Sequence, residues 1–314
     1  MSRVLVTGGS GYLGALTVDA LVAEGAHTVV SLDRRPSDTP NPAATHITAD
    51  LLEVDLAELL LSREIDTVVH LAAILEPPPG MDEDMLRRVE VGGTERVLAA
   101  CLAGKVDHLI VTSSGAAYGY TPRNRVRPLV ESDPVPGHPR FAYSRHKAEV
   151  EALLAEARAA RPELGQLVLR PGTILGERTD NRLTRLFTAP VVVGLSDTDV
   201  PFVLIHDRDV VEVIVRGVTE RTTGVVNLAG DGTVSLRDIA AIEGHRYLAL
   251  RPWLLTGALR LLHQLRLVPY GPEQVDFLRY RPVLANDRLK ELFEGLPRLS
   301  SAEVYARFRG ARDG

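Results

Sequence analysis

Three glycines spaced three residues apart are the feature that most constrains this chain. Gly8, Gly11 and Gly14 directly follow an apolar run at residues 4–6. This spacing predicts a buried strand that turns at once into a helix, with room for a backbone to approach a pyrophosphate and for the helix to pack closely on the sheet. The free N–H groups at the helix N-terminus would then face the ligand. A glycine-rich turn can also be purely structural, so the motif alone is a weak indication.

An acidic residue farther along the chain strengthens the prediction of a dinucleotide site. Apolar residues keep helical spacing up to Gly25, and residues 28–33 then form a strand pattern that ends in Asp33. A dinucleotide fold places a carboxylate about 20 residues beyond the glycines, where it binds the ribose hydroxyls. The neighbouring Arg34 can hold a 2′-phosphate. We therefore predict NAD as the cofactor, with NADP less favoured.

The order of apolar segments predicts an α/β fold. Strand patterns alternate with helix patterns through residue 171, which is typical of a Rossmann-type, doubly wound parallel sheet. A helix at 210–218 and a strand at 224–227 then return to the sheet. We expect two domains: an NAD-binding domain from residues 1–171 and 205–229, and a smaller substrate-binding domain from residues 172–204 and 230–314.

Composition and charge argue against several classes of partner. The chain of 314 residues carries a formal net charge of −5 and no basic run, which argues against nucleic acid. Its one cysteine, Cys101, excludes a disulfide framework and favours a reducing compartment, so we expect a cytoplasmic protein. The chain enters a strand pattern at once, with no room for a signal sequence. No His, Cys or acid spacing suggests a metal, and a homodimer is a possible assembly.

One apolar stretch needs separate attention because it could be taken for a membrane segment. Residues 253–268 are rich in leucine but carry Arg260, His263 and Arg266, so they are too short and too charged to span a bilayer. We expect a helix that packs on its own domain. A substrate lid or a membrane-surface helix is the alternative.

Two positions near the predicted cofactor have two interpretations each. Asp50 and Leu51 follow a short strand around Ile47. In one interpretation they contact the adenine base of the cofactor. In the other, Asp50 caps a helix beginning near Glu53. Glu90 lies one turn before two glycines on a helix, and it either faces the cofactor or is an ordinary solvent-facing charge, which we slightly favour.

A tyrosine and a lysine supply the residues for catalysis. Tyr143 and Lys147 are separated by four positions and therefore share one face of a predicted helix. The ammonium group favours the phenolate, so the phenol can act as a general base toward a hydroxyl or as a general acid toward a carbonyl. Ser114, at the end of a strand, can hydrogen-bond the same substrate oxygen. A serine satisfying the backbone at a strand end is the alternative interpretation.

Together these segments resemble the extended short-chain dehydrogenase/reductases, the NAD-dependent epimerase/dehydratase family. The resemblance covers most of residues 3–230. It rests on the glycine turn, on the segment that begins at His70, on Ser114 four residues before Tyr118, and on Tyr143 with Lys147. It implies Tyr143 as acid/base, Lys147 as a ligand of the nicotinamide ribose, and Ser114 as a substrate-orienting residue. The cofactor contacts that we predict are Gly8, Ser10, Gly11, Tyr12, Leu13, Gly14, Asp33, Arg34, Asp50, Leu51, Leu71, Ala72, Ala73, Thr112, Tyr143, Lys147 and Pro171.

The chain departs from the family pattern at three places. Glu90 replaces a usual asparagine, and Thr173 stands where sugar-nucleotide members often carry a substrate-binding asparagine. Gly115 follows Ser114 where dehydrating members have an acid, so a 4,6-dehydratase is disfavoured. Several arginines can clamp a diphosphate or simply be solvated; these are Arg123, Arg125, Arg127, Arg140, Arg178 and Arg182.

Three functions follow from these observations. The first is epimerisation of a sugar nucleotide with NAD kept bound. The second is a one-way dehydrogenase or ketone reductase that acts on a less polar, steroid- or flavonol-like secondary alcohol, which Thr173 and the apolar stretch favour. The third is a non-catalytic dinucleotide sensor, which would not need Tyr143, Lys147 and Ser114 together.

Overall fold

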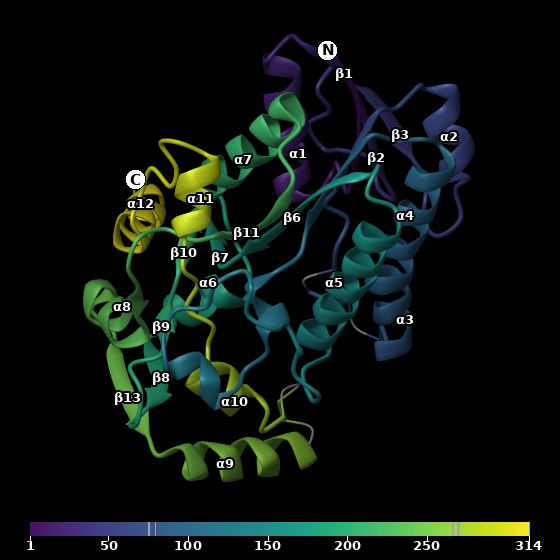
Figure 1. Cartoon of the computed structure of the whole chain (residues 1–314). Helices are drawn as coiled ribbons and strands as arrows, with labels where there is room; N and C mark the ends of the chain where they lie inside the picture. Colours follow the sequence, from purple (N-terminus) through teal and green to yellow (C-terminus); the bar gives the residue numbers. More distant parts are fainter. Residues whose placement is uncertain (75, 79, 266, 269–270, 314) are drawn as a thin grey trace.

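A seven-stranded parallel sheet forms the centre of the molecule (Figure 1). The computed structural model describes residues 1–314 except 75, 79, 266, 269–270 and 314. The strand order is β11-β6-β5-β4-β1-β2-β3, so the chain reverses direction across the sheet beside β1. The strands are β1 (Ser2–Thr7), β2 (His27–Asp33), β3 (Thr45–Thr48), β4 (Thr67–His70), β5 (His108–Thr112), β6 (Gly165–Pro171) and β11 (Gly224–Leu228).

Helices cover both faces of this sheet because its strands are apolar on both sides. Val4 and Val6 of β1 belong to the apolar cluster under α1 and α7, whereas Leu5 belongs to the cluster under α2, α4 and α5. The predicted doubly wound α/β fold is therefore confirmed. The covering helices are α1 (Tyr12–Ala23), α7 (Asp207–Glu220) and α11 (Asp287–Leu292) on one face, and α2 (Leu56–Ser62), α4 (Gly93–Ala103) and α5 (Ala142–Ala160) on the other.

A second group of elements packs around its own apolar cluster. Phe187, Phe202 and Tyr305 form the aromatic part of that cluster, with ring centroids 5.0 and 5.8 Å apart. The placement of the domain boundaries stays a prediction. The elements outside the central sheet are β7 (Thr173–Leu175), α6 (Arg182–Phe187), β8 (Val191–Leu195), β9 (Pro201–Phe202), β10 (Leu204–His206), β12 (Val234–Ser235), α8 (Leu236–Glu243), β13 (Arg246–Leu250), α9 (Pro252–Gln264), α10 (Gln274–Arg279) and α12 (Ser301–Asp313).

A π-helical turn interrupts the helical segment that follows β4. The segment consists of α3 (Glu83–Arg87), the π turn Arg88–Gly92, and α4. Such turns insert an extra residue into a helix and often occur at functional sites. Gly93 packs closely there, because a Cβ at this position would lie 3.3 Å from Leu51 Cδ2. The turn places Glu90 inward with only 3% of its surface exposed, so the favoured interpretation of a solvent-facing Glu90 is wrong.

One further interpretation from the sequence is wrong. Asp50 does not cap a helix: α2 begins at Leu56, Asp55 accepts the hydrogen bond from Glu58 N, and Asp50 Oδ1 instead accepts one from Leu52 N at 2.8 Å. The leucine-rich stretch forms the expected helix, α9, which contacts α10, although no residue of the helix is fully buried. Residue 266 of this stretch lies outside the described part of the chain. No described helix is long and apolar enough to span a membrane.

A buried polar network connects α5 to the sheet. Arg170 of β6 forms an ion pair with Glu151 of α5 at 2.8 Å, and its guanidinium also donates to the Tyr118 hydroxyl at 2.8 Å. The Tyr118 hydroxyl in turn donates to Asn227 Oδ1 of β11 at 2.8 Å. Because the side chains of Arg170 and Glu151 are nearly inaccessible, removal of either partner would leave an unpaired buried charge. The network thus fixes α5, which carries Tyr143 and Lys147, relative to β6 and β11.

Candidate active site

The glycine turn has the shape that a bound pyrophosphate requires. Gly8 has a φ of +74°, and a Cβ there would lie 2.6 Å from Ala72 N. A Cβ at Gly14 would lie 2.0 Å from Gly8 O, so α1 can pack against the turn only because this residue is glycine. Gly11 is the N-cap of α1 and provides no side-chain cap, and the first helical turn has no acid. The N–H groups and positive end of α1 therefore remain suited to a phosphate.

Asp33 faces this turn from the end of β2. Its carboxylate accepts hydrogen bonds from Ser10 N and Arg35 N, each at 3.1 Å. A hollow of about 210 Å³ adjoins it, lined by Ser10, Ser31, Arg35, Pro36, Ser37, Pro40, His46, Ile47 and Thr48. This position matches the ribose and base end of a dinucleotide whose pyrophosphate lies at Gly8 and Gly11. Arg34 is exposed beside it.

The segment after β4 closes the other side of the turn. Leu71 N donates to Thr7 O at 3.0 Å, and Leu71 and Ala72 lie directly against Gly8. Thr112 at the end of β5 contacts His70 O through its hydroxyl at 3.5 Å. The carboxyl ends of β1, β4 and β5 therefore meet at one edge of the sheet, where open α/β sheets bind ligands. Among the other predicted contacts, Tyr12 and Leu13 begin α1, Leu51 packs against Gly93, Ala73 follows Ala72, and Pro171 ends β6.

Tyr143 and Lys147 share the inward face of α5, as their spacing predicts. Lys147 Nζ lies 5.7 Å from the centroid of the Tyr143 ring. Lys147 is 4% exposed, whereas Tyr143 is half-buried and thus open to a ligand. Burial lowers the pKa of the Lys147 ammonium, but the neighbouring Glu90 and Tyr143 outweigh it and the net pKa is raised. Lys147 is therefore a fixed positive charge beside the phenol.

Glu90 is the partner of that charge. Its Oε2 lies 3.0 Å from Lys147 Nζ, and its Oε1 accepts a hydrogen bond from Ile74 N. The pair joins α5, the π turn and the segment after β4. Sequence reasoning identified Glu90 as a departure but did not predict this pairing, because the phase change introduced by a π turn has no clear sequence signal.

A chain of polar contacts links the ion pair to β1. The His70 ring lies 2.7 Å from the Thr7 hydroxyl through Nδ1 and 3.1 Å from the Thr94 hydroxyl through Nε2. Thr94 in turn donates to Glu90 O at 2.8 Å. Burial and the positive charge of Lys147 lower the pKa of His70 to about 3, so the imidazole is neutral at physiological pH. His70 thus positions the π turn and does not exchange protons there.

Ser114 is placed at the same edge of the sheet by the 3₁₀ turn Gly115–Tyr118. Its Oγ accepts a hydrogen bond from Ala116 N at 3.1 Å, as a backbone-satisfying serine would. Its own hydroxyl proton remains available to a ligand oxygen. Ser144, next to Tyr143, donates to Ala116 O at 2.5 Å and so fastens the start of α5 to the Ser114 turn. A second 3₁₀ turn follows at Pro122–Arg125.

An aromatic cluster connects the start of α5 to the C-terminal part of the chain. The Tyr120 ring packs edge-on against Phe141 and Phe277, with centroids 5.1 and 5.2 Å away. The Arg281 guanidinium lies 4.0 Å from the Phe202 ring centroid and 4.4 Å from that of Phe277. The cluster thus links Phe141, two residues before Tyr143, to Phe277, against which Arg281 stacks.

Arg281 has no carboxylate partner among the described residues. Its Nη2 donates to the Thr173 hydroxyl at 3.2 Å, and its Nη1 is buried without any described partner. Burial lowers the pKa of Arg281 to about 10, so it stays protonated at neutral pH. Arg281 as a whole is half-buried, and a half-buried cation without a counterion is costly unless a ligand supplies one. Sequence reasoning missed Arg281 because nothing distinguishes it from the other arginines of this chain.

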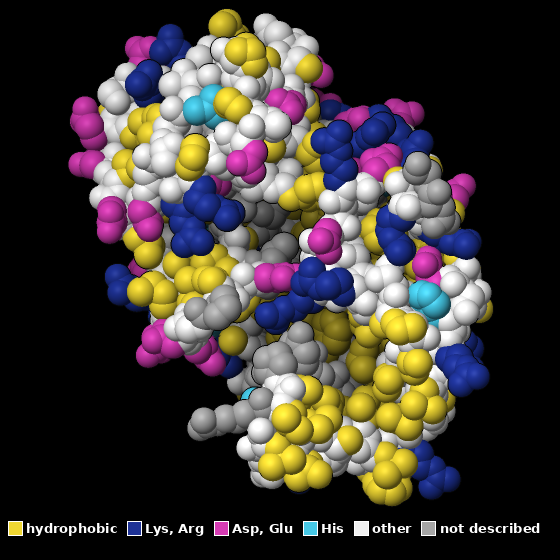
Figure 2. All heavy atoms as spheres, turned by 180° about the vertical axis from the view of Figure 1, so that it is seen from behind, with side chains coloured by type: hydrophobic (Ala, Val, Ile, Leu, Met, Phe, Trp, Pro, Cys, Tyr) yellow, Lys and Arg dark blue, Asp and Glu magenta, His cyan; other side chains and the backbone are white. Residues whose placement is uncertain are grey.

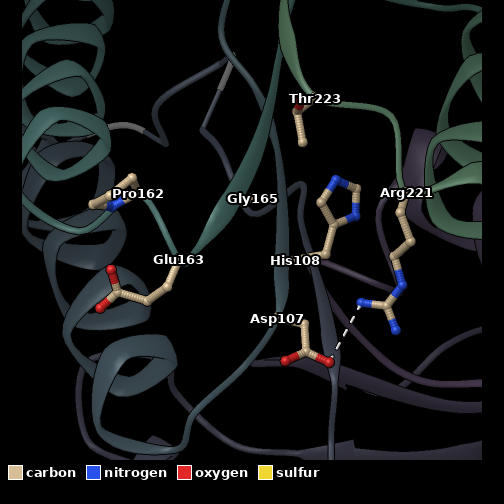
Figure 3. Close-up of a pocket in the computed structure, with 7 residues that line it drawn as sticks. All are labelled: Asp107, His108, Pro162, Glu163, Gly165, Arg221 and Thr223. Carbon is tan, nitrogen blue, oxygen red and sulfur yellow. Dashed lines mark ion pairs between the residues drawn. The ribbon is translucent and has the colours of Figure 1, made fainter.

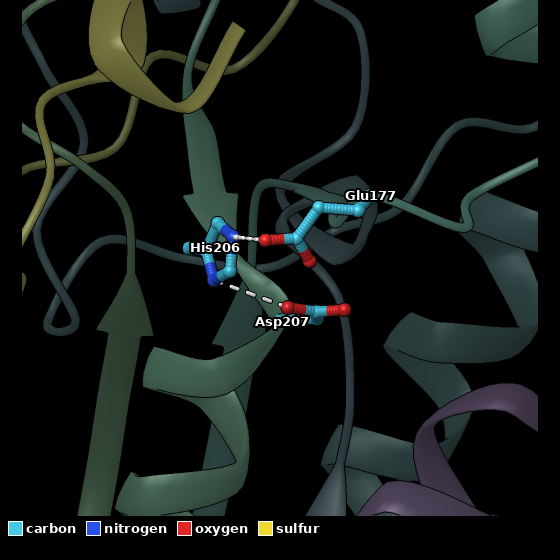
Figure 4. Close-up of side chains that lie close together, drawn as sticks. All are labelled: Glu177, His206 and Asp207. Atoms are coloured by element: carbon cyan, nitrogen blue, oxygen red, sulfur yellow. Dashed lines mark ion pairs between the residues drawn. The ribbon is translucent and has the colours of Figure 1, made fainter. Parts of the chain in front are cut away.

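A His and two acids lie close together beside the glycine turn (Figure 4). His206 is buried between them, with Nε2 3.8 Å from Glu177 and Nδ1 3.1 Å from Asp207. The carboxylates therefore face different nitrogens of one ring, whereas a metal needs ligand atoms that converge on one point. Asp207 also accepts a hydrogen bond from the Tyr12 hydroxyl at 2.5 Å. We assign this group to the anchoring of Tyr12.

Another hollow lies away from these residues. Its volume is about 460 Å³, and Figure 3 shows that its lining side chains come from the starts of β5 and β6 and from the segment before β11. Ligands of open α/β sheets bind at the carboxyl ends of strands. This hollow lies at the amino ends, so we do not place the active site there. It is lined by Asp107, His108, Pro162, Glu163, Gly165, Arg221 and Thr223.

Most of the arginines considered for a diphosphate already have acidic partners. Arg123 and Arg127 both pair with Asp133 at 2.9 Å, and Arg140 pairs with Asp276 at 2.7 Å. Arg125 lies 3.7 Å from Asp197, and Arg182 lies 3.9 Å from Glu76. These contacts indicate that all five arginines form surface ion pairs and do not bind a diphosphate.

Comparisons with known proteins show the family of this chain. The model of the NAD dependent epimerase/dehydratase family matches residues 4–229. A UDP-glucose 4-epimerase from Yersinia pestis is 32% identical over 217 residues, which is 61% of this chain and 62% of that protein. The structure of MoeE5 in complex with UDP-glucuronic acid and NAD is 30% identical, with a TM-score of 0.64, and covers 79% of this chain and 86% of its own. The UDP-glucuronic acid 4-epimerase of Bacillus cereus, with UDP-glucuronic acid and NAD, is 21% identical with a TM-score of 0.72, and covers 99% of each chain.

The buried ion pair yields the first prediction. Glu90→Gln keeps the side-chain shape but leaves Lys147 as an unpaired buried cation, so the free energy of unfolding should fall by about 3 kcal/mol. Glu95→Gln, an exposed acid on the same helical segment, is the matched control and should change it by less than about 0.5 kcal/mol. Urea denaturation measures both. A loss below about 1 kcal/mol for Glu90→Gln would show that the pair is not a structural charge pair.

Asp33 yields the second prediction. Its carboxylate accepts hydrogen bonds from ribose hydroxyls and repels a 2′-phosphate, so NAD should bind more tightly than NADP. Asp33→Asn should narrow or reverse the ratio of the two dissociation constants, which calorimetric titration measures. A wild-type preference for NADP would show that Arg34 and Arg35 outweigh Asp33.

Proposed function

Because the chain belongs to the NAD dependent epimerase/dehydratase family, we propose that it is an NAD-dependent epimerase that inverts the C4 carbinol of a nucleoside-diphosphate sugar. The observation that carries the proposal is a half-buried Tyr143 held beside a buried, charged Lys147, at the sheet edge to which the glycine turn leads. The sugar-nucleotide part is supported by the resemblance to a UDP-glucose 4-epimerase and by Arg281.

The glycine turn and Asp33 fit NAD, because the turn leaves room for its pyrophosphate and the carboxylate faces its ribose. When bound, NAD takes up a hydride from the substrate carbon and returns it. Lys147 has three N–H donors, and Glu90 occupies one of them, so two remain for the nicotinamide ribose hydroxyls. The close Glu90 carboxylate balances the charge of Lys147.

Tyr143 performs the proton transfers in this proposal. Its phenolate accepts the proton of the C4 hydroxyl as the C4 hydride departs, and the carbinol becomes a ketone. Ser114 donates its hydroxyl proton as a hydrogen bond to the same oxygen throughout. If the sugar then presented its other face to a bound NAD, Tyr143 would give the proton back to the oxygen as the ketone is reduced again. The reaction is thus redox-neutral overall and consumes no cofactor.

Arg281 supplies the counterion site for the substrate. Its Nη1 has no partner among the described residues, and its guanidinium stacks on Phe202 and Phe277. A planar guanidinium held in this way suits a bidentate contact with two oxygens of a phosphate or carboxylate group. Thr173, where many sugar-nucleotide members have asparagine, contacts Arg281 and so contributes to holding it. A steroid-like alcohol carries no anion and would leave the Arg281 charge uncompensated. This observation favours a sugar nucleotide over the less polar substrate of the alternative function.

Removal of the Tyr143 hydroxyl tests the catalytic assignment. Tyr143→Phe should lower the rate of C4 epimerisation of UDP-glucose or UDP-glucuronic acid by about a thousandfold, while the dissociation constant of NAD stays nearly unchanged. Lys147→Met should harm both turnover and NAD binding. Tyr247→Phe, on β13, is the control and should leave both as in the wild type. NMR of the sugar product measures the rate, and Tyr143→Phe activity within tenfold of wild type would exclude Tyr143 as the acid/base.

Substitution of Arg281 tests the substrate class. Arg281→Gln should raise the KM for a UDP-sugar by about tenfold or more, since a charge-assisted contact is lost, and should leave NAD binding unchanged. It should change the free energy of unfolding only slightly, because the loss of stacking on Phe202 and Phe277 is offset by removal of a half-buried charge that has no acidic partner among the described residues. Arg237→Gln, a ring-stacked arginine that has an acidic partner, is the control and should not change the KM. An unchanged KM for Arg281→Gln together with lost stability would assign Arg281 a structural role instead.

A further inference from the structure

Helix α9 stands at one end of the molecule with little protein against it (Figure 1). No residue of the helix is buried. Leu255, Leu259 and Leu262 are half-buried on one side, toward the rest of the chain. The proposed reaction does not use this helix.

The adjacent side of α9 carries an exposed apolar ridge. Leu254, Leu261 and Leu265 are 44%, 57% and 58% exposed, and the spacings of seven and four residues place them on one face of the helix. Trp253 at the first turn is 65% exposed, and Leu267 just past the helix is 67% exposed. Apolar side chains gather at this end of the molecule in the space-filling view (Figure 2). A continuous exposed apolar ridge of this kind marks an interaction surface.

The segment around the ridge is exclusively basic. Residues 244–272 contain four arginines and two histidines but no acid, although the whole chain has more acidic than basic residues. Arg246, Arg251 and Arg260 are exposed, and no ion pair involves their side chains within the described part of the chain. Most other arginines of the protein pair with acids, as at Arg123 and Arg140. The charge around the ridge is therefore uncompensated within the described structure.

We propose that α9 is a membrane-surface helix that binds anionic lipid bilayers. The leucine ridge enters the boundary between headgroups and acyl chains, Trp253 lies at the interface, and the arginines contact the lipid phosphates. Charge complementarity selects this occupant. A second copy of the chain docking α9 against α9 would bring two acid-free, basic segments together without a counterion. The binding is peripheral, because the helix is too short to span a bilayer.

Trp253 is the only tryptophan of the chain, so its fluorescence reports on α9 alone. The full-length protein is titrated with vesicles of phosphatidylcholine, with and without one-third phosphatidylglycerol. We expect a blue shift and quenching by brominated acyl chains with the anionic vesicles. Binding to pure phosphatidylcholine should be weaker by about tenfold or more, and added salt should weaken the anionic binding.

Matched variants separate the ridge from general surface effects. Leu261→Asp should abolish the blue shift, whereas Leu61→Asp, at a 55% exposed leucine of α2, should leave it unchanged. The double variant Arg251→Gln/Arg260→Gln should bind anionic vesicles about tenfold more weakly or worse. Equal loss in Leu61→Asp would overturn the proposal.

Three outcomes with the wild-type protein would also overturn it. The first is no vesicle binding. The second is a blue shift that depends on protein concentration without lipid, which would identify a second copy of the chain as the occupant. The third is burial of Trp253 on addition of a UDP-sugar alone, which would identify a substrate lid.

Discussion

The structure around the active site depends on the buried ion pair between Lys147 and Glu90. Lys147 is nearly inaccessible beside Tyr143, and a buried ammonium group is stable only with a partner. Glu90 is that partner, and it reaches Lys147 because a π turn rotates it inward. The same carboxylate holds Ile74 N, and the Glu90 backbone is held by Thr94, so one pair fixes α5 relative to the turn after β4.

Backbone groups and small residues form the proposed cofactor side of the site. Aromatic residues and a charged arginine form the proposed substrate side. Gly8 and Gly14 are required because Cβ atoms would collide with Ala72 and with the turn itself. On the other side, the aromatic cluster of Tyr120, Phe141 and Phe277 leads from α5 to Arg281. The proposed preference for an anionic substrate rests on this arginine, which has no acidic partner among the described residues. The position of Arg281, unlike that of the glycine turn, depends on contacts between segments far apart in the sequence.

Local patterns in the sequence predicted much of the fold and the main candidates of the site. Alternating apolar runs identified the parallel sheet, and the glycine spacing with Asp33 identified the cofactor turn. The spacing of Tyr143 and Lys147 predicted their shared face. The interpretations that failed depended on tertiary packing: a π turn directs Glu90 inward, and α2 begins at Leu56, so Asp50 does not cap it. Arg281 could not be singled out, because its lack of a partner is visible only in three dimensions.

The most direct test of the central claim follows a hydrogen atom. The wild-type protein is incubated with a UDP-sugar that carries deuterium at C4 of the sugar ring, in ordinary water without added NAD, and the products are analysed by mass spectrometry and NMR. If the hydride leaves and returns within one site, as proposed, the C4 epimer forms with its deuterium retained and no free keto sugar accumulates. Deuterium lost to water, or a keto sugar formed in proportion to reduced cofactor, would contradict the account.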